Sequence, residues 1–206
     1  MILEQMRDAV RTRLGAPPDE TFYYAQSLDD LINEALQTIS AEADWPWLES
    51  TETINTVAGT RFYTPLDANW ATTKALSIAG YDAMTFLDLQ EVRNWPDDVR
   101  DIPVYYTIYQ EQLYLAPAPS AVYALRHDFI KAEPKLVDNS AVPLMPSIYH
   151  YSVVAFAVYL AHLRSGDVTR ANAANQEYVA WVKRMMARKE RATSTIKVRV
   201  RPGRDL

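Results

Sequence analysis

Three histidines are the residues of this chain best suited to acid–base chemistry or metal binding: His127, His150 and His162. Two imidazoles that share a metal ion on one helix stand three or four positions apart, and no pair here has that spacing. A metal site is therefore not expected. We expect His150 and His162 to lie on one helix as partly buried or interfacial side chains.

Carboxylates gather at Asp97, Asp98 and Asp101, close to Trp95 and Pro96. Such a cluster could bind Ca²⁺, but the segment has neither the glycine nor the distal glutamate of a calcium-binding loop. A solvated turn is the better interpretation.

The motifs of nucleophilic catalysis and phosphate binding are missing from the sequence. There is no cysteine and no Gly-x-Ser-x-Gly turn. The five glycines are too far apart for a phosphate-binding loop or a dinucleotide fingerprint; they are Gly15, Gly59, Gly80, Gly166 and Gly203. We therefore expect a protein that is not an enzyme and that holds no cofactor.

The charged residues are distributed unevenly along the chain. Residues 1–182 carry 12 basic and 24 acidic side chains, a net charge of −12, whereas residues 183–206 carry 9 basic and 2 acidic ones, a net charge of +7. An acidic body avoids polyanions, while a basic C-terminal segment favours a negatively charged partner.

The basic segment begins with five cations near the end of a predicted helix: Lys183, Arg184, Arg188, Lys189 and Arg191. They can be a solvated helix end that complements the negative pole of the helix dipole. They can also dock onto an acidic surface or onto phosphates, and the sequence alone leaves both interpretations open.

Apolar residues at helical spacing predict helices on either side of a middle segment. The first runs from residue 3 to 14 and ends at Gly15, and the second starts at Ser27 as N-cap and reaches about residue 43. A third, apolar almost all round, runs from 148 to 163, and a fourth follows Asp167 as its cap.

The middle segment, residues 45–132, is rich in Thr, Val, Tyr and Ile at a period of two, which predicts strands. We expect one hairpin from 51–57 and 60–64, a second from 74–79 and 84–89, and a third from 104–109 and 112–116. A longer strand is expected over 122–130 and one helical turn over 90–95.

The predicted fold is thus α+β, a four-helix bundle with a β-sandwich-like or barrel-like module inserted between helices 2 and 3. Residues 1–44 and 134–193 form the bundle, 45–133 the module and 194–206 an extended C-terminal arm. In the arm, Ile196, Val198 and Val200 alternate with Lys197, Arg199 and Arg201, and Arg204 follows. That alternation is typical of a strand that pairs with another protein.

Four tryptophans lie near predicted element boundaries: Trp45, Trp47, Trp70 and Trp95. They are possible anchors of a subunit interface, where tryptophan is common. For Trp45 and Trp47, core packing is the favoured interpretation and an exposed anchor the alternative.

Several segments resemble the family of phage head-to-tail connector proteins called adaptors or tail accessory factors. LINEALQTISAEADWPWLE followed by TETINTVAGTRFYTP resembles the family's helix, tryptophan and first hairpin. PVYYTIYQEQLYLAPAPS resembles its strand, turn, strand and proline run, and VPLMPSIYHYSVVAFAVYLAHLRSGD its proline-led third helix. One departure is the turn often held by glycine, which here is Gln110-Glu111; a longer loop can be built without glycine.

The resemblance implies a virion protein that forms a homo-oligomeric, twelve-fold ring beneath the portal protein, with a tail or neck protein below it. The arm would dock on the portal, and packaged DNA would pass through without sequence-specific binding. Assembly is expected in the host cytoplasm, and no membrane is expected, because the longest apolar run, residues 153–163, is too short to span a bilayer. The alternatives are another neck component, such as a stopper or tail terminator, and a nucleic-acid-binding protein acting through its basic arm.

Overall fold

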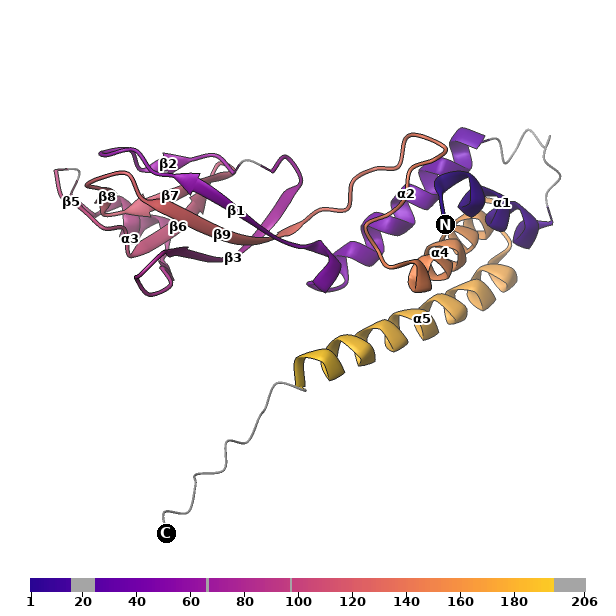
Figure 1. Ribbon diagram of the computed structural model, residues 1–206. Coiled ribbons are helices and arrows are strands. Elements are labelled where there is room, and N and C mark those ends of the chain that lie inside the picture. The colour runs from indigo at the N-terminus through magenta and orange to yellow at the C-terminus, as the bar shows by residue number, and fades with distance from the viewer. Residues whose placement is uncertain (16–24, 66, 97, 195–206) are drawn as a thin grey trace, which may run out of the picture. The chain divides into compact units, whose positions relative to one another are not determined.

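The computed structural model in Figure 1 describes residues 1–15, 25–65, 67–96 and 98–194. The chain divides into two compact units, one formed by Met1–Trp47 with Glu133–Leu206 and the other by Leu48–Ala132. We call them the helical unit and the β unit. The arm residues Ile196–Arg204 lie outside the described residues.

The helical unit contains α1 (Leu3–Leu14), α2 (Ala25–Ala41), the 3₁₀ turn η2 (Ser147–Tyr149), α4 (His150–Arg164) and α5 (Val168–Ser194). Gly15 ends α1 in the left-handed conformation, as the sequence predicts. The prediction that Ser27 caps the second helix is wrong, because α2 already includes it; the Ser27 hydroxyl instead accepts a hydrogen bond from Arg164 Nη1 at 3.2 Å. Asp167 does cap α5, accepting a bond from the Arg170 amide at 3.0 Å.

The all-round apolar character of α4 follows from its place in the helical unit. It contacts α1, α2 and α5, and both views show it among these helices. Its buried residues therefore cover most of its circumference, from Val153 to Ala161. The side chain of Asn33 holds the long loop that precedes α4. Its Oδ1 accepts from the Leu136 amide at 2.7 Å and its Nδ2 donates to the Leu136 carbonyl at 3.0 Å. The backbone groups of Leu136 are thus paired although this residue belongs to no strand.

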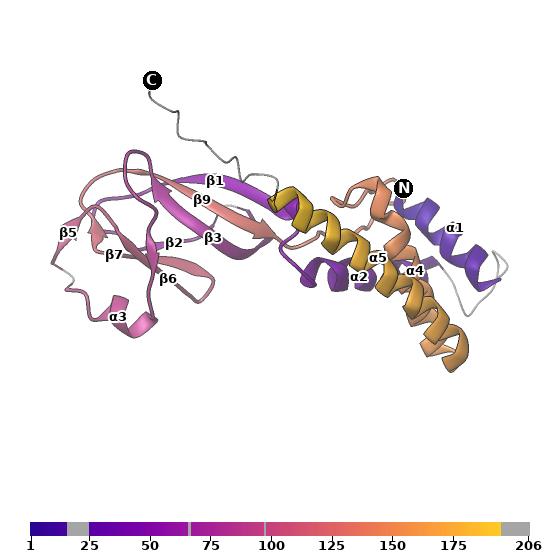
Figure 2. The same ribbon diagram turned by 90° about the horizontal axis from the view of Figure 1, so that it is seen from below.

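The β unit follows the 3₁₀ turn η1 (Pro46–Leu48) and contains three sheets, and Figure 2 shows the long strands of the first sheet side by side. The first sheet has the order β1 (Glu49–Asn55), β9 (Ala124–Lys131), β3 (Trp70–Ile78). The second has the order β2 (Phe62–Tyr63), β7 (Gln112–Ala116), β6 (Tyr105–Tyr109), β4 (Thr85–Phe86). β5 (Arg100–Asp101) pairs with β8 (Ala118–Pro119), and the short helix α3 (Leu89–Arg93) falls where one helical turn was predicted.

The first predicted hairpin is wrong. A tight turn does form between Val57 and Thr60, closed by a 3.0 Å backbone hydrogen bond, but the flanking strands enter different sheets. β1 pairs with β9 and β2 pairs with β7. The predicted turn is therefore present, but the predicted pairing of its two flanking strands is not. β1 pairs instead with β9, which lies more than sixty residues further along the chain.

The second predicted hairpin is only a short contact, and the third is confirmed. Ser77 bridges to Ala83, after which β4 leaves to pair in parallel with β6, while β3 pairs with β9. β6 and β7 form the predicted hairpin. Its turn is a tight one and not a longer loop, because Gln110 and Glu111 both have positive φ, at 50° and 57°.

Side chains of the two larger sheets share one hydrophobic core. Leu76 and Leu125 come from the first sheet, and Leu113 and Leu115 from the second, all without exposure to solvent. The mixed α+β class is confirmed. The finer description as a four-helix bundle with an inserted module remains our proposal.

Candidate docking site

The five cations of the basic helix end all lie in the C-terminal half of α5. Four of them are exposed, and Lys189 is half-buried, with its amine 5.9 Å from the centre of the Trp45 ring. Arg184 lies over the Trp181 ring at 5.4 Å. Met185, between them in sequence, is 1% exposed and faces the core of the helical unit.

A pocket of about 200 Å³ opens beside these cations, and all of its lining residues belong to the helical unit. Its apolar walls include Trp47, Ile148, Tyr149 and Met185, and its basic residues are Arg188 and Lys189. We call it the Trp47 pocket. Its lining residues come mainly from three elements: the turn η1, the turn η2 and helix α5.

The aromatic wall of the Trp47 pocket is built from rings in contact with one another. Trp47 stacks on Trp45 with ring centres 4.7 Å apart and planes 11° apart, and it contacts Tyr149 at 5.6 Å. Trp45 is fully buried, and its Nε1 donates to the Ile39 carbonyl at 2.6 Å. The structure thus assigns Trp45 to the core, while Trp47 is half-buried and lines the pocket.

The Trp47 indole N–H is buried, and within the described ranges no acceptor bonds to its Nε1. Buried donors are nearly always paired in proteins, so an unpaired one marks either strain or a missing partner.

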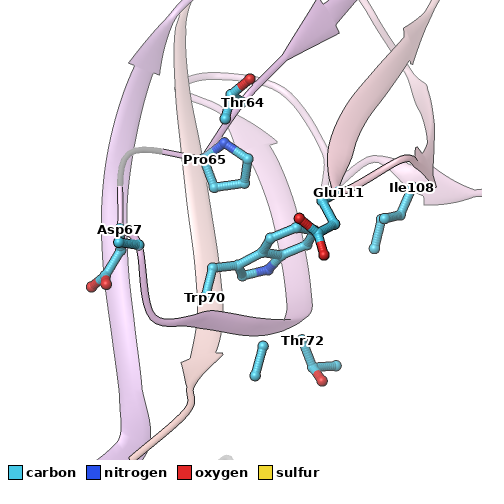
Figure 3. Close-up of a pocket in the computed structure, with 9 residues that line it drawn as sticks. Thr64, Pro65, Asp67, Trp70, Thr72, Ile108 and Glu111 are labelled. Atoms are coloured by element: carbon cyan, nitrogen blue, oxygen red, sulfur yellow. The ribbon is translucent and has the colours of Figure 1, made fainter. Parts of the chain in front are cut away.

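Trp70 and Trp95 belong to the β unit. Trp95 is half-buried against Tyr105, with ring centres 5.2 Å apart. Trp70 donates its Nε1 hydrogen to Thr73 Oγ1 at 3.2 Å and lines a second pocket, of about 500 Å³. Figure 3 shows the carboxylate of Glu111 turned towards the Trp70 ring. In this view the ring is drawn below Pro65.

A model of the SU10 adaptor protein family matches residues 1–202. The chain belongs to that family. The match covers both the helical unit and the β unit, and the family is one of structural phage proteins. No curated protein matches the chain.

Two histidines of this adaptor-family chain, His127 and His150, have hydrogen-bond partners, and His162 is buried on α4. His127, fully buried, bonds through Nδ1 to Glu52 at 2.8 Å and through Nε2 to Thr73 at 2.9 Å. Burial lowers the pKa of His150, whose Nε2 must carry the hydrogen because it bonds to the Met145 carbonyl at 2.9 Å. Among the residues that the structure describes, no three side chains of His, Asp or Glu are placed to hold a metal ion, and no helix could cross a membrane.

Sequence reasoning identified the cations and Trp47 but missed Ile148 and Tyr149. Ile148 was assigned to a buried helix, yet it is 56% exposed at the pocket. Its position directly after Pro146-Ser147 could have indicated this exposure, because a residue in the first turn of a helix has no preceding turn to cover it. The arm residues lie outside the described part of the chain.

Proposed function

We propose that this protein is the head-to-tail adaptor of a tailed phage, located in the neck of the virion. Twelve copies form a ring beneath the portal, join a tail or neck protein below, and extend the DNA channel. The observation that carries the proposal is the family match over residues 1–202, which includes every described element.

Each part of the chain has a role in this proposal. Residues 1–44 and 134–193 form the four-helix bundle, 45–133 the inserted module, and 194–206 the portal-docking arm. A closed ring needs different patches on the two sides of each subunit. Trp47, Trp70 and Trp95 are half-buried and remain candidates for such patches.

The basic helix end supports docking onto an acidic surface. Its cations follow one another along the last turns of α5 and continue into the basic residues of the arm. Charge complementarity of this kind raises the association rate and fixes the orientation of the partners.

The acidic body suits a channel through which DNA slides. With a net charge of −12 over residues 1–182, the body repels phosphates instead of binding them. A nucleic-acid-binding protein, the alternative that the basic arm allows, would bind duplex DNA tightly as a monomer, with strong salt dependence. The adaptor predicts little duplex binding by the body.

Electron microscopy of the protein mixed with its own portal tests the proposal. A ring of density added to one end of the portal, with the portal's rotational symmetry, is the expected result. A portal that stays bare at saturating concentrations of folded protein would reject the proposal.

A further inference from the structure

We propose that the Trp47 pocket binds one large apolar side chain of the portal protein, presented by a segment in which carboxylates flank that side chain. This inference rests on the proposed function, because it takes the portal to be the partner, and it adds the chemistry of the contact.

The size and walls of the pocket suit a single side chain. Pockets for drug-sized molecules have volumes of about 300–1,000 Å³, and this one has about 200 Å³. Ile148 is 56% exposed at the pocket although isoleucine is among the most buried residue types. Met185 also lines the pocket, and methionine adapts its shape to what it packs against. An apolar occupant would bury the exposed part of Ile148.

The unpaired Trp47 N–H indicates what else the occupant supplies. The indole lies against Trp45 and Tyr149, and its donor has no acceptor in the part of the chain that the structure describes. A backbone carbonyl beside the inserted side chain, reached by a small rotation of the indole, would satisfy it.

The charge around the pocket decides the flanking residues. Arg188 and Lys189 are the charged residues of its lining, and residues 183–206 carry 9 basic and 2 acidic side chains. Carboxylates on the occupant would therefore form charge-assisted hydrogen bonds at the mouth of the pocket. Tryptophan, tyrosine and arginine, all present here, are the residue types enriched where binding energy concentrates.

Charge argues against the chain's own arm as the occupant, and position favours the portal over a second copy. The chain's own arm is disfavoured, because Lys197, Arg199, Arg201 and Arg204 would meet like charges. A second copy has an acidic body and is the main rival. Lys189 precedes the helix end at Ser194 by five residues, about 8 Å along the axis. A partner that holds the arm therefore also reaches the pocket.

The test compares two matched variants of the full chain in binding to purified portal rings. Ile148→Glu places a carboxylate at the pocket mouth, and because Ile148 is exposed the fold should tolerate it. Val168→Glu makes the same change at a residue that is 60% exposed, seventeen positions and about 25 Å before Met185 along α5. Thermal unfolding checks that both variants fold.

We expect Ile148→Glu to weaken portal binding about tenfold or more, as loss of a central apolar anchor does, and Val168→Glu to leave it unchanged. A photo-crosslinking residue, p-benzoylphenylalanine, at position 148 should attach to a portal peptide that contains Asp or Glu.

Equal binding by Ile148→Glu and wild type would overturn the inference while leaving the adaptor function intact. So would crosslinks to a second copy or to residues 195–206. If the wild-type protein does not bind the portal at all, the proposed function fails and this inference fails with it.

Discussion

Removing the guanidinium of Arg7 should destabilise the helical unit severely, because Arg7 ties α1 to α2 through a nearly buried ion pair. Its Nε and Nη2 donate to the two carboxylate oxygens of Asp29, both at 2.8 Å, and Nη2 also donates to Asn139 Oδ1 at 3.1 Å. The two charged side chains are only 10% and 13% exposed. In Arg7→Met the Asp29 carboxylate would remain in the fold without its cation.

The expected cost follows from that burial. Breaking a buried pair on one side costs about 3–5 kcal/mol, and the residual exposure of both groups places this one near the lower end. A loss of about 3 kcal/mol corresponds to a decrease in Tm of roughly 6–12 °C for a chain of this length. Urea unfolding followed by helical circular dichroism measures the free energy of unfolding directly.

The control makes the same change at Arg13, which is also on α1 but whose ion pair, with Glu177 of α5, is more exposed. Arg13 bonds to both oxygens of Glu177, at 3.0 and 2.9 Å, but its side chain is 33% exposed and that of Glu177 44%. Arg13→Met should therefore cost less than about 1 kcal/mol. The double variant Arg7→Met with Asp29→Leu should recover most of the loss. Equal costs for Arg7→Met and Arg13→Met would refute the reasoning.

Three further outcomes are expected. Truncation after Thr193 should leave the Tm nearly unchanged while portal pull-down is lost, because the alternating apolar and cationic residues of the arm predict a strand that pairs with another protein; a truncated chain that fails to fold contradicts this. Gln110→Asn with Glu111→Gly should stabilise the β unit to urea by about 1 kcal/mol, because both positions have positive φ; no gain would mean that the turn is unstrained. Burial raises the pKa of Glu133, although its Oε1 accepts from the Leu144 amide at 2.7 Å. The folded state then holds the proton more tightly than the unfolded state, so stability declines as the pH rises above about 4.5 towards the raised pKa. Glu133→Gln should remove this decline and raise the Tm at pH 7.5 more than at pH 4; an equal effect at both would exclude this cause.

The sequence predicts the helices well because their signals are local. Gly15 and Asp167 mark helix ends by their own backbone and side-chain chemistry, and the all-round apolar run of α4 is visible in a short window. The third hairpin is equally local, since β6 and β7 are joined by two residues.

Strand pairing in the rest of the β unit could not be predicted in this way. β9 lies between β1 and β3, and it comes after both of them in the chain. The turn near Gly59 is formed as expected, but a turn does not decide which sheet each flanking strand joins. Burial of Leu125 between the sheets, a long-range effect, decides it.

The Trp47 pocket was only partly predictable for the same reason. The cations of α5 follow one another in sequence, so a charge count finds them. Ile148 and Tyr149 come about a hundred residues after Trp47, and only the packing of the helical unit brings the three together.

The central claim is that this chain forms a ring on the portal, and cryo-electron microscopy of the portal incubated with an excess of the protein tests it most directly. The account predicts a continuous ring of additional density beneath the portal, twelve copies around a channel wide enough for duplex DNA, with α5 directed towards the portal. Portal particles without added density, or scattered copies that form no closed ring, would contradict it.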